Sequence, residues 1–353
     1  MVMRGGTSKG AYFVADDLPA DPVARDDLLL RVMGSPDPRQ IDGIGGAHPL
    51  TSKVAVVSRS ERDGVDVDYL FLQVGVDDAV VGDRQNCGNL LAGVGQFAID
   101  RGLVTPDHAA ATASVRIHLV NTGSDATAEF AIRDGRAVET GSTEIAGVPG
   151  TGAEVRIEFD GIAGGSCGAL LPTGRPRDTI DGVAVTLVDH GMPVVVLRAA
   201  DLGVTGTESP AELEADRELR TRLESIRLAA GPLMDLGDVS GATVPKITMV
   251  APPADDGDLL TRTFIPHRCH EAIGVLGAVS VATAARLPGS PAAAELRHLG
   301  MDDTVTLEHP TGTFTATVDV DVSVDPPVVR RAGIIRTARR LMDGVVFPRT
   351  GAS

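Results

Sequence analysis

The chain has 353 residues, 43% hydrophobic and 23% charged, which is ordinary for a globular protein and long enough for two domains. Its formal net charge of −16, with no long basic block, excludes a surface built to bind nucleic acid. No apolar run reaches the ~18 residues that cross a bilayer, and the opening MVMRGGTSKG lacks the apolar stretch of a signal peptide. We therefore expect neither a nucleic-acid nor a membrane partner, and a cytoplasmic protein.

The first half of the chain is predicted to consist mostly of strands. An early helix is expected over 22–34, and strands over 53–60 and 66–76. Strands at 114–120 and 126–138 suggest a hairpin around the turn Asp134-Gly135. Before this hairpin, LLAGVGQFAIDRGL is small and apolar nearly all round, which predicts a buried central helix over about 87–102.

The second half repeats this plan. Its predicted strands are followed by an apolar, Gly- and Ala-rich helix over about 270–287, and a polar helix over 210–230 is expected on the surface. Because the two buried helices begin about half the chain apart, we predict an α+β fold of two pseudo-symmetric domains, 1–178 and 179–353. Each would be a curved β-sheet or barrel around its central helix, with the last residues packing back on the first domain.

This arrangement has a functional consequence. If both central helices point their N-termini into the cleft between the domains, their free N–H groups form two facing anion sites suited to a di- or tricarboxylate. The alternative is that the two helices start in unrelated places.

Two residue types stand out. The three cysteines Cys87, Cys167 and Cys269 are far apart and odd in number, so we expect reduced thiols. Only three of the 32 basic residues are lysines, namely Lys9, Lys53 and Lys246. Arginine cannot exchange a proton near neutral pH and lysine can, so each lysine is a candidate functional group. Codon bias is the alternative explanation.

Cys87 lies in the first turn of the first buried helix. The helix dipole there favours a thiolate, and Gly88 would let a substrate approach the backbone. Asn86 and Asn89 offer neutral donors to a carboxylate or an enolate. The alternative is a small buried residue, which is the commoner fate of a cysteine.

Lys53 follows the glycine-rich turn DGIGGAHPLTS and opens a strand. Gly45 and Gly46 could present N–H groups to an anion. A merely solvated lysine is the alternative at such a position.

Other motifs fail on their spacing. In MRGGTSKG the order Ser8-Lys9-Gly10 is wrong for a phosphate-binding loop, and GGSCG at 164–168 lacks the strand and helix of a nucleophile elbow. HRCHE at 267–271 matches no zinc spacing, so His270 is expected to contact substrate or to cap the second central helix. We predict no metal and no cofactor.

Seven ordered motifs resemble the PrpF family of isomerases, which has the diaminopimelate-epimerase-like fold. They are MRGGTSKGAYF, DGIGGAHPLTSKVAVVS, QNCGNLLAGVGQFAI, LLPTG, VPKI, CHEAIGVLGAVSVATAARLPG and RTARRLMDGVVFP. Family members usually have a short strand before the first motif, so the resemblance also implies a truncated or misassigned N-terminus.

The resemblance implies that Lys53 and Cys87 are the proton-transfer pair and that the substrate lies between the two domains. The residues then expected to bind substrate are Ser8, Gly45, Gly46, Ala47, His48, Asn86, Gly88, Asn89, His270 and Gly274. Related epimerases carry a second cysteine where this chain has Gly274, with Cys269 displaced nearby. This departure argues against inversion of an amino acid and favours a 1,3-proton shift.

Two activities of the family compete. The motifs are closer to the 4-oxalomesaconate tautomerases of gallate breakdown, and 2-methylaconitate cis-trans isomerase is the alternative. A non-catalytic carboxylate-binding protein is the alternative of another class. The expected partner is thus a small di- or tricarboxylate, and a homodimer is compatible with the sequence.

Overall fold

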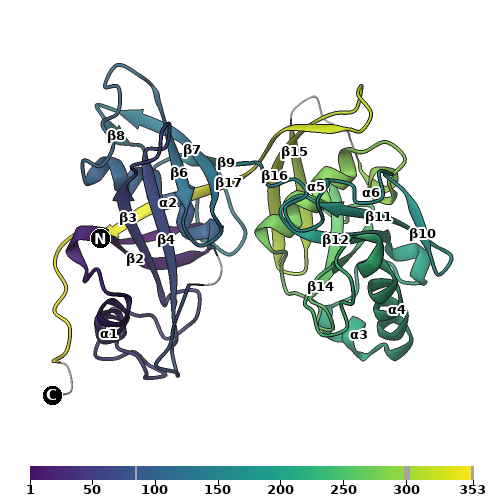
Figure 1. Ribbon diagram of the computed structural model, residues 1–353, viewed down its shortest axis with the longest axis horizontal. Coiled ribbons are helices and arrows are strands. Elements are labelled where there is room, and N and C mark those ends of the chain that lie inside the picture. Colours follow the sequence, from purple (N-terminus) through teal and green to yellow (C-terminus); the bar gives the residue numbers. More distant parts are fainter. Residues whose placement is uncertain (84–85, 298–302, 351–353) are drawn as a thin grey trace. The chain divides into compact units, whose positions relative to one another are not determined.

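The computed structural model describes residues 1–83, 86–297 and 303–350, and its contacts divide the chain into two units (Figure 1). The first unit is Met1–Asp160 with Ile335–Ser353, and the second is Gly161–Ile334. No helix among the described residues is both long and apolar enough to cross a membrane.

The first unit is a closed barrel around a helix. Its elements are β1 (Val2–Gly5), β2 (Ser8–Val14), the 3-10 helix η1 (Ala15–Asp17), α1 (Pro22–Met33), β3 (Lys53–Arg59), β4 (Val67–Val74), β5 (Val81–Gly82), α2 (Gly88–Asp100), β6 (Thr112–Leu119), β7 (Ser124–Arg133), β8 (Arg136–Ala137), β9 (Glu154–Asp160) and part of β17 (Val328–Met342). Strand pairing runs β1-β2-β3-β4-β6-β7-β9-β17 and returns to β1, which closes the sheet.

Helix α2 lies inside this barrel, with every residue from Leu90 to Ile99 buried (Figure 1). Its glycines allow this close packing. A Cβ at Gly93 would lie 2.6 Å from the Tyr12 hydroxyl, and one at Gly95 would lie 2.5 Å from the Phe130 ring. The small, apolar composition seen in the sequence is therefore a condition for fitting a helix inside a barrel.

The second unit contains the remaining elements. They are β10 (Asp178–Ile180), β11 (Val183–Asp189), β12 (Pro193–Arg198), the 3-10 helix η2 (Ala199–Leu202), α3 (Pro210–Ala215), α4 (Arg217–Leu233), β13 (Lys246–Ala251), β14 (Leu259–Phe264), α5 (Val275–Arg286), α6 (Pro291–Glu295), β15 (Thr304–His309), β16 (Gly312–Asp321) and the first part of β17. Helix α5 packs on β11, β12, β15 and β16, and Gly277 to Ala285 are buried.

The two units repeat one topology. From β1 to β9 the successive pairings are antiparallel, parallel, antiparallel, parallel, antiparallel and antiparallel. The pairings from β11 to β17 follow the same order. The central helix enters at the same point of each series, after β5 and after β14. The predicted α+β fold of two similar domains, each a curved sheet around a central helix, is confirmed.

Two element boundaries differ from the prediction. The second central helix begins at Val275 and not near 270, because Cys269 still pairs with Phe264, the chain bends at Glu271 and Ala272, and Gly274 has an extended backbone. The polar helix is split into α3 and α4 at Asp216, whose side chain caps the second piece by accepting from the Leu219 N–H. The hairpin around Asp134-Gly135 is confirmed by the pairing of Arg133 with Arg136.

The contacts divide the chain at Asp160 and Ile335, whereas the sequence placed a boundary at 178. Hydrogen bonds explain why the second unit begins at Gly161 and not at 179. The N–H groups of Ser166 and Cys167 donate to the carboxylate of Asp189 at the end of β11, which ties this loop to the second unit. After Ile335, β17 pairs with β1 of the first unit.

Candidate functional site

The turn of the β1–β2 hairpin lies against the beginning of α2. The Asn89 amide donates to the Thr7 hydroxyl at 3.1 Å, and the Thr7 N–H donates back to Asn89 Oδ1 at 3.4 Å. A Cβ at Gly5 would lie only 2.4 Å from the Asn89 carbonyl oxygen, and Gly6 has a left-handed φ of 51°. The glycines of MRGGTSKG therefore serve this close approach.

Cys87 is the N-cap residue of α2, and its side chain makes no capping hydrogen bond. It is half-buried, and its carbonyl oxygen accepts from the Tyr69 hydroxyl at 3.3 Å. Burial raises the pKa of both Tyr12 and Tyr69 well above 10, and the negative charge of the Cys87 thiolate raises each further. The thiol thus lies at the head of a helix beside two neutral phenols, and Gly88 begins the helix proper.

Arg336 is a charged neighbour that the sequence reasoning missed. It is buried on β17, and its Nε donates to Asn89 Oδ1 at 3.2 Å across 247 positions of the chain. Burial lowers the pKa of Arg336 to about 10, an effect that the Cys87 thiolate opposes. The guanidinium remains charged near neutral pH and lies close enough to Cys87 for the two groups to interact electrostatically. Its only trace in the sequence is its place within RTARRLMDGVVFP.

Lys53 is buried, with 8% of its surface exposed, and it is not the solvated lysine of the alternative interpretation. Its Nζ donates to Gln73 Oε1 at 2.7 Å and lies 5.0 Å from the centre of the Phe71 ring. The Gln73 amide in turn donates to the Ser52 carbonyl at 2.8 Å. The ammonium is therefore held in place by a neutral acceptor and an aromatic face, with no carboxylate beside it in the described part of the chain.

Lys53 and Cys87 belong to the same end of the barrel. β2 and β3 run parallel, with Gly10 opposite Lys53, so both strands begin at this end. The hairpin turn that precedes β2 contacts Asn89 in the first turn of α2. A lysine at a strand head and a thiol at a helix head are thus supplied by neighbouring elements of one unit.

Two polar atoms near this end are buried without a hydrogen-bond partner among the described residues. They are the Ser8 hydroxyl oxygen and Asn86 Oδ1. The Asn86 amide N–H donates to the Thr122 hydroxyl at 2.6 Å. Buried polar atoms are rarely left unsatisfied, so these two are available to a ligand.

The glycine-rich turn before β3 is held by Gln40. Its Oε1 accepts from the Ala47 N–H at 2.8 Å, and the Gly45 N–H donates to the Met33 carbonyl. These two N–H groups are therefore already used, which limits the predicted anion nest. Of the four predicted residues from Gly45 to His48, Gly46 and His48 have N–H groups with no acceptor within the described structure.

His270 and Gly274 belong to the second unit. Gly274 is the N-cap residue of α5, and His270 Nδ1 accepts from the Ala272 N–H at 2.8 Å. Burial lowers the pKa of His270, and the positive charge of Lys246 lowers it further. His270 is therefore a neutral ring with its proton on Nε2, a donor suited to an anion.

The residues of HRCHE do not converge. His267 lies 3.7 Å from Glu224, whereas the Cys269 N–H donates to Glu214 at 3.0 Å. Burial raises the pKa of the Cys269 thiol to about 11. No group of three or more His, Cys, Asp or Glu side chains suited to a metal ion occurs among residues 1–83, 86–297 and 303–350.

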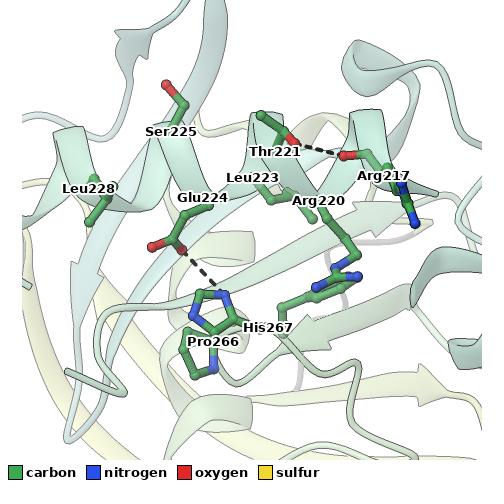
Figure 2. A pocket seen from close by; sticks show the side chains of 10 residues that line it. Arg217, Arg220, Thr221, Leu223, Glu224, Ser225, Leu228, Pro266 and His267 are labelled. Atoms are coloured by element: carbon green, nitrogen blue, oxygen red, sulfur yellow. Dashed lines mark hydrogen bonds and ion pairs between the residues drawn. The ribbon is translucent and has the colours of Figure 1, made fainter. Parts of the chain in front are cut away.

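A pocket of about 680 Å³ also lies in the second unit, between α4 and the loop after β14. Figure 2 shows its lining, with Glu224 directed toward His267 and with Arg220 beside them. None of the predicted site residues lines it. This pocket therefore shares no residue with the predicted site.

The fold and site together define a class: α+β proteins of two similar units, with a lysine and a half-buried thiol at one end of the first. A solved structure described as methylitaconate-delta-isomerase has this fold, with a TM-score of 0.90 and 37% identity over 100% of this chain and 96% of that one.

Residues 1–349 match the family described as PrpF protein, and the chain belongs to this family. A (4E)-oxalomesaconate Delta-isomerase of a Novosphingobium species is 58% identical over 98% of this chain and 96% of its own. A 4-oxalomesaconate tautomerase of Pseudomonas putida is 56% identical over 98% and 94%. The protein is an isomerase, as predicted, and the non-catalytic alternative is set aside.

Proposed function

We propose that this isomerase interconverts the keto and enol forms of a tricarboxylate, 4-oxalomesaconate, in the breakdown of aromatic compounds such as gallate. The observation that carries the proposal is the pair formed by Lys53 at the head of β3 and Cys87 at the head of α2. The two relatives named for oxalomesaconate, each more than half identical over nearly the whole chain, support the substrate.

The proposed reaction is a 1,3-proton shift. One of Lys53 and Cys87 removes a proton from the carbon next to the oxo group, and the C–H electron pair moves into the enolate. The other residue delivers a proton at the far end of the three-atom system, so that no electrons are gained or lost. Arg336 supplies a buried positive charge that interacts with Cys87, and Gln73 orients the Lys53 ammonium.

The substrate carboxylates and the enolate need donors. We propose the Ser8 hydroxyl, the N–H groups of Gly46 and His48, and the α2 N-terminus at Gly88 and Asn89. His270 and Gly274 of the second unit complete the proposed set. The sharing of one substrate by both domains stays a prediction, as does a homodimer, which light scattering would test.

The test uses oxalomesaconate in deuterated water and follows both the ultraviolet change and deuterium uptake. We expect Lys53→Met and Cys87→Ser each to lower exchange by at least about 100-fold, the usual contribution of a positioned acid or base. Lys53→Met keeps an apolar side chain of similar length and removes the ammonium that lies over Phe71, and Cys167→Ser is the matched control because that buried thiol is not among the proposed site residues.

The outcomes separate the alternatives. Wild-type exchange in either variant would contradict the assignment of the pair. Turnover of 2-methyl-cis-aconitate in place of oxalomesaconate would favour the other activity of the family. A chelator should leave the rate unchanged, because we propose neither metal nor cofactor.

A further inference from the structure

Lys246 occupies in the second unit the place that Lys53 occupies in the first. Lys53 is the first residue of β3 and pairs with Gly10 of the parallel strand β2. Lys246 is the first residue of β13 and pairs with Val194 of the parallel strand β12. β3 and β13 are each followed by an antiparallel partner in the repeated series. Two of the three lysines of the chain are therefore equivalent by topology.

The counterpart of Cys87 is Gly274. Both are N-cap residues of the central helix and both have extended backbones. Lys246 Nζ lies 3.9 Å from the point where a Cβ would stand at Gly274, and no nearer atom surrounds that point. The lysine is thus beside an open position at the head of α5, where the first unit has its thiol.

The surroundings of the two lysines differ. Lys53 has Gln73 as its hydrogen-bond acceptor. In the second unit Ile247 of β13 pairs with Phe264 of β14, so the residue opposite Lys246 is the apolar Ile265. Lys246 is half-buried, burial lowers its pKa, and its ammonium has no hydrogen bond or ion pair among the described residues. His270, whose Nε2 carries a proton, is the polar group that shares its surroundings.

We propose that Lys246 is a substrate-binding residue, whose ammonium holds a carboxylate of the tricarboxylate together with His270 Nε2. Without a thiol at Gly274, this lysine lacks the partner that a proton shift requires, and it contributes charge. A half-buried cation with no protein acceptor is matched by an anionic ligand. This inference rests on the proposed function and names a further residue of the same reaction.

The experiment compares Lys246→Gln and Lys246→Arg with the matched control Arg222→Gln, which removes an exposed charge from α4 of the same unit. Tautomerase kinetics and calorimetric binding of tricarballylate, a stable tricarboxylate, are measured for each. We expect Lys246→Gln to raise KM and the tricarballylate Kd about 10- to 100-fold, as for loss of a charged hydrogen bond, with kcat changed less than about threefold. Lys246→Arg should recover most of the affinity.

A second variant guards against misfolding. Gly274→Ala adds a methyl group in ordinary contact with Lys246 Nζ, at 3.9 Å, and with an ordinary φ of −70°, so the fold should persist while tricarballylate affinity falls. Unchanged affinity in Lys246→Gln, a loss of kcat alone, or no tricarballylate binding by the wild type would overturn the inference. Lys246-dependent binding without proton exchange in the wild type would instead contradict the proposed function and leave the inference intact.

Discussion

Burial decides which ionisable residues of this chain are reactive. Burial, reinforced by Asp189, raises the pKa of the Cys167 thiol to about 12, and burial raises that of Cys269 to about 11. Both thiols are therefore inert near neutral pH. Cys87 is half-buried at a helix head, with Arg336 near enough for their charges to interact. An alkylating reagent at pH 7 should thus report on Cys87 alone.

Substitution of Arg336 tests its electrostatic effect on Cys87. Arg336→Gln should slow alkylation of Cys87 by iodoacetamide at pH 7 and lower tautomerase kcat about 10- to 100-fold, because the thiolate loses its buried counter-charge. Arg336→Lys keeps the charge and should retain part of the alkylation rate and part of kcat. Cys87→Ser gives the background labelling. Equal alkylation rates in wild type and Arg336→Gln would show that the guanidinium does not act on the thiol.

The central helix of the second unit is fixed to its sheet by a buried histidine. His190 follows β11, and its N–H donates to the Ser280 hydroxyl of α5 at 3.1 Å. Its Nδ1 lies 2.8 Å from the Thr283 hydroxyl, which itself donates to the Val279 carbonyl, so Nδ1 is the donor in that bond. Burial lowers the pKa of His190 from 6.5 to about 4. Burial therefore keeps the ring neutral in the folded protein near neutral pH.

Burial of the His190 ring should make stability depend on pH. The unfolded chain binds a proton at His190 below pH 6.5, whereas the folded chain does so only near pH 4. The free energy of unfolding should therefore fall as pH falls through this window, by up to about 3 kcal/mol. Urea unfolding at pH 7 and pH 4.5 measures it. His190→Asn should flatten the dependence, and the exposed His108→Gln should not; a parallel dependence in His190→Asn would refute the assignment.

At the scale of the whole molecule, one strand belongs to both units. The first part of β17 pairs with β16, and its residues from Ala338 to Met342 pair with β1 (Figure 1). The same strand also pairs with β9 and carries Arg336. The first unit is therefore completed by the last part of the chain, whereas the second is continuous in sequence.

Truncation tests this dependence. A chain ending at Ile334 lacks the part of β17 that closes the first barrel. We expect this chain to lose tautomerase activity and to become sensitive to protease, with cleavage confined to residues 1–160. A chain ending at Gly344 keeps all of β17 and the Arg101–Asp343 ion pair and is the matched control. Full activity of the shorter chain would show that the barrel does not need β17.

The sequence by itself determined the strands, the two buried helices, the half-chain repeat, and Lys53 and Cys87 as the unusual residues. Periodicity, helix-start chemistry and rare residue types are local signals, and they can be read along the chain. Tertiary structure decided what surrounds these residues. Arg336 reaches Asn89 across 247 positions because β17 closes the barrel, and Lys246 matches Lys53 through strand pairing. Folding of the chain after α1 back onto the end of that helix directs the N–H groups of Gly45 and Ala47 to the Met33 carbonyl and to Gln40, and no periodic pattern in the sequence encodes that path.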